Sequence, residues 1–401
     1  MNRTVAMLFG LVAGLIVTFS ATAQSERLQV VATHTILTDV VRNVAGDAAD
    51  VTALMPANTD PHSFVPTPSD VARLADADVV FVNGASFEEG LLEVIENAAE
   101  GVNIVEASQC VMILPFGAHD HAHEEGQSPE AEATEMHDDE HDSSLPSLPD
   151  GEFAERCAGY YEEIAILHGE AHEHEGDHAD EDAHEHEDGH AHETEALGPL
   201  YALDCSAGHD HEAETGDEHG HEEGGCDPHV WWEPHNVIYW TMTIRDTLAE
   251  LDPANAETYR ANAAAYIEAL DALVHDEIRP LIESLPEAQR ILVTDHDSLG
   301  YFAHAYGFEV VGVVIAGGST LAEPSSSETA TLIDTIRQEG VSAIVVGSTV
   351  SSVMADQVAA ETGAAIVNIY TDSLSDPEGP AANYLDFMRY NARIIIEALV
   401  E

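Results

Sequence analysis

The chain contains no lysine, and arginine supplies all 12 of its basic residues against 76 acidic ones. The formal net charge is −64, with every histidine counted as neutral. So few positive charges argue against a nucleic-acid-binding protein and against anionic membrane surfaces, because phosphates would be repelled rather than neutralised. The excess of carboxylates favours cations as partners. The alternative is that the acidity serves only solubility, as in a salty habitat.

Long apolar runs are missing beyond the first 20 residues. Residues 6–19 form one apolar run, which is shorter than the ~20 residues of a membrane-spanning helix. It follows Arg3 and precedes Ala-Thr-Ala at 21–23, which is typical of a signal peptide (residues 1–23) cleaved after Ala23. No cysteine follows this cleavage site. The sequence therefore predicts a soluble periplasmic protein, without a lipid anchor or direct membrane insertion, that begins at Gln24.

Cysteine is scarce, and no Cys-x-x-Cys occurs. The four cysteines are Cys110, Cys157, Cys205 and Cys226. An even number in an oxidising compartment indicates disulfides, for which three pairings are possible. A nested pairing would hold together the base of the segment between Cys110 and Cys226, but the spacing does not decide the pairing. A soft metal site is the less favoured alternative, because the usual short ligand spacing is missing.

Histidine, by contrast, is abundant and concentrated in one segment. Residues 118–225 hold 17 of the 24 histidines and 35 acidic residues but a single arginine. Such a composition cannot bury an apolar core, so we predict a mostly disordered insert rich in His, Asp and Glu. Two short parts are expected to be ordered, a helix at 153–167 and a short strand at 200–203. The insert is interpreted as a loose store that gathers zinc, and the alternative is a solvated acidic loop.

Outside the insert, short strands alternate with helices. Strands are predicted at 27–33, 51–55, 78–82, 102–105, 290–294, 310–314, 343–346 and 365–368, and helices at 36–44, 68–74, 88–98, 234–251, 299–306, 325–338, 351–362 and 384–399. This alternation is typical of parallel sheets with helices on their faces, so the predicted fold class is α/β. We assign residues 24–117 and 226–252 to an N-terminal lobe and residues 286–401 to a C-terminal lobe.

One long helix is predicted between the two lobes, at residues 253–285. Asp252 supplies an N-cap, and Pro253 occupies the first helical position. Apolar residues at helical spacing continue from 259 to 285, which gives a rod of roughly 45 Å at about 1.5 Å per residue. Pro280 is expected to kink this rod. A helix of this length indicates a rigid spine between two lobes rather than an element inside one.

The tripeptide Asp-Pro-His occurs twice, at 60–62 and at 227–229. In each copy the proline fixes φ near about −65°, so the histidine follows a stiff bend. Ligands of open α/β sheets bind at the carboxyl ends of strands. Four polar side chains are expected at such ends, namely those of His62, His229, His296 and Asp372.

Three imidazoles and one carboxylate suit tetrahedral Zn²⁺ at about 2.0–2.2 Å, whereas Mn²⁺ draws more oxygen ligands. Each residue also has a simpler interpretation. Either tripeptide can be a turn whose histidine faces water. His296 lies between two acids and can be a hydrogen-bonded histidine, and Asp372 can cap a turn.

Six segments resemble the metal-binding solute-binding proteins of ABC importers. They are Thr-Ile-Leu-Thr-Asp-Val-Val at 35–41, Asp-Pro-His-Ser-Phe-Val-Pro-Thr-Pro-Ser-Asp at 60–70, Asp-Pro-His-Val-Trp at 227–231, His-Asp-Ser-Leu-Gly-Tyr-Phe at 296–302, Glu-Pro-Ser at 323–325 and Glu-Thr-Gly-Ala at 361–364. They occur in the family's order, and the resemblance covers nearly everything from Gln24 to Glu401 except the insert. The chain is therefore identified as a member of this TroA-like, cluster 9 family, and among its members it resembles the zinc-uptake (ZnuA-type) proteins.

The resemblance implies two lobes joined by a rigid helix, with a metal ion between them. It implies His62, His229 and His296 as ligands, with Asp372 as the fourth. It also implies zinc, because zinc members have a histidine at the third position, where manganese members have glutamate, and carry a His-rich loop before the second signature. Two features depart from the family pattern. The insert is longer than usual and contains cysteine, and Gly-Ser-Thr stands at 347–349 where members often have an acid.

The predicted function is that of a monomeric, high-affinity zinc-binding protein that delivers Zn²⁺ to the permease of an ABC importer at the inner membrane. The alternatives are a manganese- or iron-binding member of the same family, a periplasmic zinc buffer or chaperone, and a zinc hydrolase. A hydrolase needs an open coordination position and a general base, for which Asp60, Glu88, Asp295 and Asp297 are candidates. It is the least favoured, because a fourth protein ligand closes the site and no His-Glu-x-x-His or nucleophile motif occurs.

Overall fold

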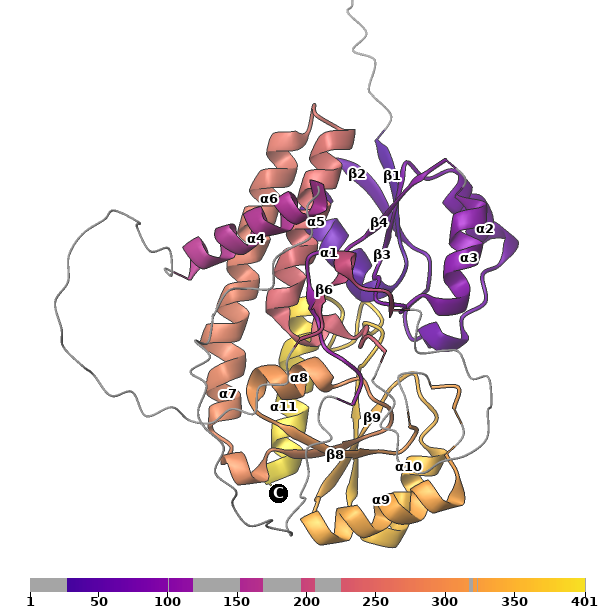
Figure 1. The fold of residues 1–401 in the computed structure, drawn as a ribbon, viewed down its shortest axis with the longest axis vertical. Coiled ribbons are helices and arrows are strands. Elements are labelled where there is room, and N and C mark those ends of the chain that lie inside the picture. Colours follow the sequence, from indigo (N-terminus) through magenta and orange to yellow (C-terminus); the bar gives the residue numbers. More distant parts are fainter. Residues whose placement is uncertain are drawn as a thin grey trace, which may run out of the picture.

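The computed structural model describes residues 27–99, 101–117, 152–168, 196–205, 225–316, 320–322 and 324–400. Two four-stranded parallel sheets are each flanked by helices, and one long helix runs beside both (Figure 1). This arrangement confirms the predicted α/β fold class with its two lobes. The predicted signal peptide and most of the predicted insert lie outside the described residues. No helix in the described part of the chain combines the length and the apolarity that a bilayer crossing requires.

The first sheet has the strand order β2-β1-β3-β4, and every pair is parallel. Its strands are β1 (Leu28–Ala32), β2 (Ala49–Ala53), β3 (Val79–Val82) and β4 (Asn103–Glu106). Its helices are α1 (Thr35–Ala45), which packs on one face, and α2 (Pro68–Ala75) and α3 (Glu89–Ala98), which lie on the other (Figure 1). All four residues of β3 are buried, as expected of a parallel strand that is covered on both faces.

The second sheet has the order β10-β9-β7-β8 and is also parallel. Its strands are β7 (Ile291–Thr294), β8 (Glu309–Val313), β9 (Ala343–Gly347) and β10 (Ala365–Ile369), and its helices are α8 (Gly300–Tyr306), α9 (Ser326–Glu339), α10 (Val353–Thr362) and α11 (Tyr384–Val400). Neighbouring residues of β7 belong to two different apolar clusters. Leu292 belongs to the main core, whereas Val293 packs in a second cluster with Leu332 of α9. The predicted strands and helices of both sheets are confirmed to within two residues.

Two helices lead from the first half of the molecule to the second. α5 (Pro234–Leu251) has its predicted bounds. The next helix, α6 (Ala256–Ala272), begins three residues later than predicted. The prediction of Pro253 at the first helical position was wrong because Asp252 and Asn255 form a turn instead. Nδ2 of Asn255 donates to Oδ2 of Asp252 at 2.6 Å.

The long helix continues beyond α6 as a π-helical segment (Leu273–Ile278) and then as α7 (Arg279–Glu283). Residues 256–283 thus form a rod of about 42 Å at 1.5 Å per residue. Pro280 accounts for the π-helical segment, because it has no N–H to donate and its ring would clash with the carbonyl four residues earlier. The Arg279 N–H accordingly donates to the carbonyl of Val274, five residues back. Since α6 packs on α1 and α7 packs on α11, the rod spans both halves.

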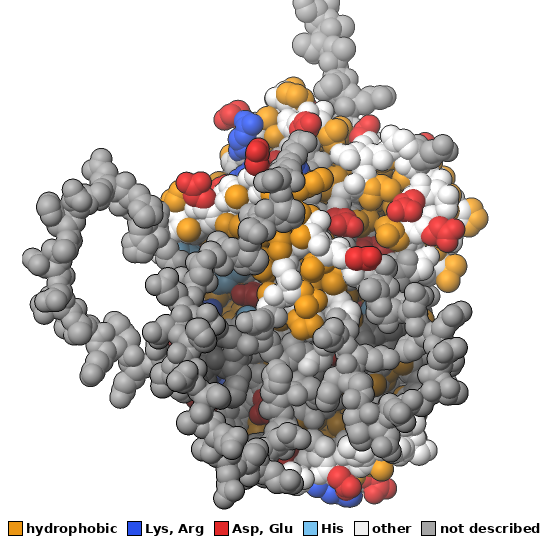
Figure 2. Space-filling model, viewed as in Figure 1, with side chains coloured by type: hydrophobic (Ala, Val, Ile, Leu, Met, Phe, Trp, Pro, Cys, Tyr) orange, Lys and Arg blue, Asp and Glu red, His pale blue; other side chains and the backbone are white. Residues whose placement is uncertain are grey.

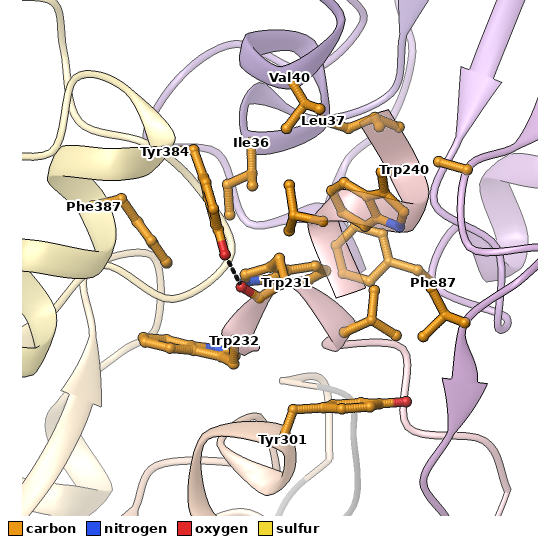
Figure 3. Packing of buried hydrophobic residues seen from close by; sticks show 14 of the residues in the cluster. Ile36, Leu37, Val40, Phe87, Trp231, Trp232, Trp240, Tyr301, Tyr384 and Phe387 are labelled. Carbon is orange, nitrogen blue, oxygen red and sulfur yellow. Dashed lines mark hydrogen bonds between the residues drawn. The ribbon is translucent and has the colours of Figure 1, made fainter. Parts of the chain in front are cut away.

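The two halves share one apolar core. Its centre is built from fully buried aromatic side chains, including those of Trp231, Trp232, Trp240, Tyr301 and Tyr384 (Figure 3). Hydrogen bonds cross this core. The Tyr384 hydroxyl donates to the Trp231 carbonyl at 2.6 Å, and Nε1 of Trp231 donates to the Thr371 carbonyl at 3.1 Å. Separating the halves would expose this core and break these bonds, so we expect little movement between them.

Two disulfides attach the described parts of the insert to the first half. They join Cys110 to Cys157 and Cys205 to Cys226. Of the three pairings that the sequence left open, the structure has the sequential one rather than the nested one. Cys157 lies in α4 (Glu152–Leu167), which is the helix predicted within the insert. The first disulfide therefore holds this helix on the core.

The strand predicted at residues 200–203 was wrong. Leu200–Ala202 form a 3-10 turn, and the strand is β6 (Gly198–Pro199), which pairs antiparallel with β5 (Met112–Ile113). The reason is that Leu200 is buried against the first half, so this apolar run turns inward after only two paired residues.

Candidate metal centre

The structure brings the four predicted site residues together. One donor atom from each of His62, His229, His296 and Asp372 lies within 4.8 Å of all the others. His62 lies in the 3-10 turn Pro61–Ser63, and His229 immediately precedes a second such turn. His296 follows β7 by two residues, and Asp372 follows β10 by three. Each half of the molecule therefore contributes two of the four side chains.

The prediction that all four residues follow strands of the sheets was only partly right. It holds for His296 and Asp372. His62, however, is nine residues beyond the end of β2. His229 comes after an isolated antiparallel bridge between Pro115 and Cys226, not after a strand of a parallel sheet.

The two Asp-Pro-His tripeptides position their histidines by equivalent hydrogen bonds, from the backbone N–H of the histidine to the side chain of the aspartate. The backbone N–H of His62 donates to Oδ1 of Asp60 at 3.0 Å, and that of His229 donates to Oδ1 of Asp227 at 2.9 Å. The proline between them has no N–H and a fixed φ, so the aspartate closes the turn onto the histidine. Asp60 also accepts from the Thr320 hydroxyl of the second half at 2.8 Å.

A carboxylate also orients two of the imidazole rings. Nδ1 of His229 lies 2.8 Å from Oδ1 of Asp227, and Nδ1 of His296 lies 2.9 Å from Oδ1 of Asp295. With Nδ1 donating, each ring presents Nε2 to the centre of the site. This is the carboxylate–histidine pairing that fixes the tautomer of metal-binding histidines. Asp227 and Asp295 are thus positioning residues, a role that sequence reasoning did not assign to them.

Asp372 lies between these two rings. Its Oδ1 is 3.7 Å from Nε2 of His229, and its Oδ2 is 3.8 Å from Nε2 of His296. The side chains of all three residues are fully buried. The Thr371 hydroxyl donates to Oδ2 of Asp372 at 2.8 Å and fixes the carboxylate further.

Burial and charge shift the pKa values in opposite directions across the site. Burial, opposed by the charge of Asp372, lowers the pKa of His62 to about 4. Burial also acts to lower the pKa of His296, but the charge and hydrogen bond of Asp295, together with the charge of Asp372, outweigh it and raise that pKa to about 9. Burial alone would raise the pKa of Asp372, yet the imidazoles around it, His296 foremost, hold that pKa below its usual range. The metal-free site therefore holds an ion pair of His296 and Asp372.

A wall of aromatic rings surrounds the site. The ring of Trp231 lies 5.4 Å from that of His229, and the ring of Phe87 lies 5.8 Å from that of His62, between centroids. A further histidine, His34, is buried behind them, 5.2 Å from Trp231, and burial lowers its pKa to about 3. Sequence reasoning missed His34, whose only signal was its place at the end of β1. It is a neutral part of the wall and not one of the four donors.

The donor atoms fit one metal ion. On the four site side chains, five buried polar atoms lack a hydrogen-bond partner within the described residues: both ring nitrogens of His62, Nε2 of His229, Nε2 of His296 and Oδ1 of Asp372. Leaving so many buried polar atoms unsatisfied is costly unless a ligand satisfies them. Around tetrahedral Zn²⁺, ligand atoms at about 2.0–2.1 Å from the ion are roughly 3.3–3.5 Å apart. The separations from Asp372 to His229 and His296, 3.7 and 3.8 Å, need little contraction to reach that geometry, and all the donor atoms lie within 4.8 Å of one another.

Residues 30–398 match the family model described as "Zinc-uptake complex component A periplasmic". The chain belongs to this family. The predicted membership is thereby confirmed, and it makes the chain a substrate-binding protein of the metal-uptake ABC importer class. The match runs through both halves of the molecule and across the insert, so it covers all four site residues.

The relatives carry the names of binding proteins for different metals. The chain is 25% identical over 378 residues to the manganese-binding lipoprotein MntA of Halalkalibacterium halodurans, covering 93% of this chain and 89% of the relative. It is 24% identical over 389 residues to the iron ABC transporter substrate-binding lipoprotein MtsA of Streptococcus pyogenes, covering 96% and 93%.

Among solved structures, the fold resembles that of the periplasmic zinc-binding protein TroA from Treponema pallidum, with a TM-score of 0.62, 21% identity and coverage of 93% and 99% of the two chains. It also resembles a manganese-bound periplasmic metal-binding protein from Candidatus Liberibacter asiaticus, with a TM-score of 0.61, 22% identity and coverage of 93% and 100%. These likenesses confirm the fold, while the names of the relatives span several metals.

Adding one methyl group at Gly300 is expected to weaken metal binding about tenfold or more. A Cβ there would lie 2.5 Å from Oδ2 of Asp227, so the carboxylate that orients His229 must move. Loss of such an outer partner typically costs about 10–100-fold in metal affinity. Titration of Gly300→Ala against a zinc chelator checks this. Gly90→Ala is the matched control, because nothing lies within 4 Å of a Cβ at Gly90. Equal affinities for both variants would contradict the positioning role of Asp227.

Proposed function

We propose that this protein captures Zn²⁺ between its two halves and delivers it to the permease of an ABC importer. The observation that carries the proposal is the buried donor set, in which His62, His229 and His296 face the single carboxylate of Asp372. Membership of a family of periplasmic uptake components supports the delivery role. The proposed location is the periplasm, where Arg3, the apolar run and the cleavage site after Ala23 would direct the chain, and the proposed state is a monomer.

Zinc is favoured over manganese by the chemistry of the donors. Three ring nitrogens and one carboxylate make a nitrogen-rich site for four ligands, whereas Mn²⁺ prefers more oxygen donors. A second carboxylate near the ring of His296 is Asp295, but it is occupied. Its Oδ1 accepts from the backbone and the ring of His296, and its Oδ2 accepts from the Gly347 N–H at 2.7 Å.

Zn²⁺ is therefore expected to bind at least about 100-fold more tightly than Mn²⁺, in keeping with their order in the affinity series. Competition for the tight site at equal free metal concentrations measures this ratio. Cu²⁺ and Ni²⁺ serve as controls, because a nitrogen-rich site should bind them too. Displacement of Zn²⁺ by an equal concentration of Mn²⁺ would favour the manganese- or iron-binding role that the names of the relatives suggest.

We infer that the protein is not a zinc hydrolase. Four protein donors leave no open position for a catalytic water at a tetrahedral ion. The carboxylates that sequence reasoning offered as general bases have other partners. Asp60 and Asp295 hold histidines, Asp297 accepts from the Gly117 N–H at 3.1 Å, and Glu88 accepts from the Thr33 hydroxyl at 2.7 Å.

We propose that the histidines of the insert gather zinc for the central site. Sixteen of the 17 lie outside α4 and its end, in segments rich in carboxylates. Each pairing of ligands there must order the chain around the ion, so each site is expected to be weak. Histidine must also be neutral to bind zinc, so this capture is expected to fade as the pH falls through about 6.5.

Replacing these 16 histidines by asparagine is expected to abolish the weak zinc equivalents that they supply and to retain the tight central site. Substitution is preferable to deletion of residues 118–225, because deletion would remove the disulfide partners of Cys110 and Cys226. Equilibrium dialysis counts the bound ions, and growth of cells that depend on this protein for zinc measures uptake. Uptake should fall mainly when zinc is scarce. An unchanged number of bound ions would mean that the insert is a solvated acidic loop. Uptake that is equal with and without the permease would instead favour a zinc buffer.

A further inference from the structure

A second group of metal-binding side chains lies away from the central site, where α4 crosses the long helix. It consists of His168, His235, Asp271 and His275, and one donor atom of each lies within 4.8 Å of all the others. His168 directly follows α4, His235 is the second residue of α5, Asp271 belongs to α6, and His275 belongs to the π-helical segment. We call this set the helix-crossing cluster. No member belongs to the central site.

Its members already converge on one another. Oδ1 of Asp271 lies 3.1 Å from Nε2 of His168 and 3.4 Å from Nε2 of His275. The three rings form a triangle, with centroids 5.2 Å apart for His168 and His235 and 5.8 Å apart for the other two pairs. Nε2 of His235 is buried and has no hydrogen-bond partner among the described residues. The cluster thus has a nitrogen atom for which the described part of the chain supplies no partner.

Contacts elsewhere on α4 hold His168 in this position. The disulfide from Cys157 to Cys110 fixes one end of the helix. Further along it, the Tyr160 hydroxyl donates to Asp246 of α5 at 2.8 Å, and Glu163 pairs with Arg245 of α5 at 2.8 Å. Figure 1 shows α4 lying across α5 and α6. Because these contacts precede His168 along the helix, its ring is placed against the other three side chains before any ion binds.

The cluster differs from the central site in its access to solvent. The side chains of His168, His235 and Asp271 are 26%, 18% and 28% exposed, and that of His275 is 47% exposed. Figure 2 shows histidine side chains at the surface on the left of this face, in the region where Figure 1 places α4 across the long helix. An ion there would be reached from solvent without opening the core.

We propose that the helix-crossing cluster is a second binding site for a divalent ion of the zinc class. Three imidazoles and one carboxylate are again a tetrahedral nitrogen-rich donor set. The exposed side chains are less rigidly held than the buried ones, so the second site is weaker than the central one. The simpler interpretation is a group of hydrogen-bonded surface residues. The unsatisfied Nε2 of His235 argues against it, because hydrogen bonding among the described residues leaves this atom without a partner.

The site would tie the insert to the long helix. His168 belongs to the insert, and seven more histidines follow it between 172 and 192. The other three ligands belong to helices of the two-sheet body. An ion bound at the cluster therefore fixes the start of this histidine-rich stretch on the long helix, at the end of α4.

Histidine modification in the full mature chain tests the proposal residue by residue. Diethyl pyrocarbonate reacts with accessible neutral imidazoles, and mass spectrometry reports each histidine separately. The probe is Zn²⁺ alone, added beyond the one equivalent that fills the central site. We expect His168, His235 and His275 to become protected together, with a common midpoint, while the exposed His304 of α8 stays reactive. Zinc that protects the histidines at 172–192 but leaves these three reactive would overturn the proposal.

Variants separate the two sites. His275→Gln is expected to move the midpoint of zinc protection at His168 and His235 at least about tenfold higher, because one of four ligands is lost. Asp276→Asn, an exposed neighbour in the same segment, is the matched control and should leave the midpoint unchanged. Protection that is equally strong in His275→Gln would contradict the site. In His296→Ala, zinc should still protect His168, His235 and His275, because the central site is not part of this cluster. Failure of the central zinc site and failure of this proposal therefore give different results.

Discussion

Replacing His296 by alanine is expected to weaken zinc binding at the central site by at least about 100-fold. His296 supplies one of only four donors, and loss of a mere outer partner of such a ligand already costs about 10–100-fold. Water cannot readily take its place, because the His296 side chain is fully buried among protein groups. A competition titration against a chelator of nanomolar zinc affinity isolates this site, since the weak sites of the insert do not compete with such a chelator.

His304→Ala is the matched control for this result. It removes an exposed imidazole from α8, close in sequence to His296 and outside both histidine clusters. Circular dichroism of each metal-free variant checks folding. If His296→Ala does not fold, the half-buried His62 offers the same test with less damage to the core. An affinity for zinc in a folded His296→Ala that equals that of His304→Ala would remove His296 from the site.

Lowering the pH from 8 to 6 is expected to weaken zinc binding at the central site by about 100-fold. The pKa of His296 in the metal-free protein is raised to about 9, because the charge and hydrogen bond of Asp295 and the charge of Asp372 outweigh burial. Throughout this range the imidazole is protonated without metal, and zinc must displace one proton from Nε2. One displaced proton makes the affinity fall about tenfold for each unit by which the pH drops below the pKa.

The direction of the pH dependence distinguishes the loss of zinc affinity at low pH from acid unfolding of the protein. The raised pKa of His296 stabilises the metal-free fold, because the charged imidazole keeps its carboxylate partners; this contribution is fully present below about pH 6.5 and is lost as the pH rises from there through about 9. Between about pH 6.5 and 9, zinc affinity thus rises with pH while the contribution of His296 to the stability of the metal-free protein falls. Calorimetry in two buffers of different ionisation enthalpy should also show the release of about one proton per zinc at pH 7.5. An affinity that is constant between pH 6 and 8 would contradict the ion pair of His296 and Asp372.

The strands and helices were predictable because each carries a local signal. β3 and β9 are short valine-rich runs, and α9 is capped by Ser325, whose hydroxyl accepts from the Glu328 N–H in a capping box. The errors arose where a distant contact decides the local structure. Leu200 turns into the core of the first half, and Asp252 closes a turn on Asn255. The disulfide pairing was unpredictable for the same reason, since it depends on where α4 packs.

The three central histidines could be predicted because each lies in a short motif, and Asp372 because it follows a predicted strand, whereas their supports could not. Asp227 and Asp295 are recognisable only once the rings of His229 and His296 are in place. The sequence contains a single local signal of the helix-crossing cluster, which is the i, i+4 spacing of Asp271 and His275. His168 and His235 are 67 residues apart in the sequence, and only the packing of α4 on α5 brings them together.

The zinc anomalous signal of a crystal of the metal-loaded protein tests the central claim most directly, because it gives the identity of the ion and its ligands together. The account predicts a peak, present above and absent below the zinc absorption edge, at about 2.0–2.2 Å from a ring nitrogen of His62, Nε2 of His229, Nε2 of His296 and a carboxylate oxygen of Asp372. A fully loaded crystal with no such peak among these four residues, or with a strong peak there only for manganese, would contradict it.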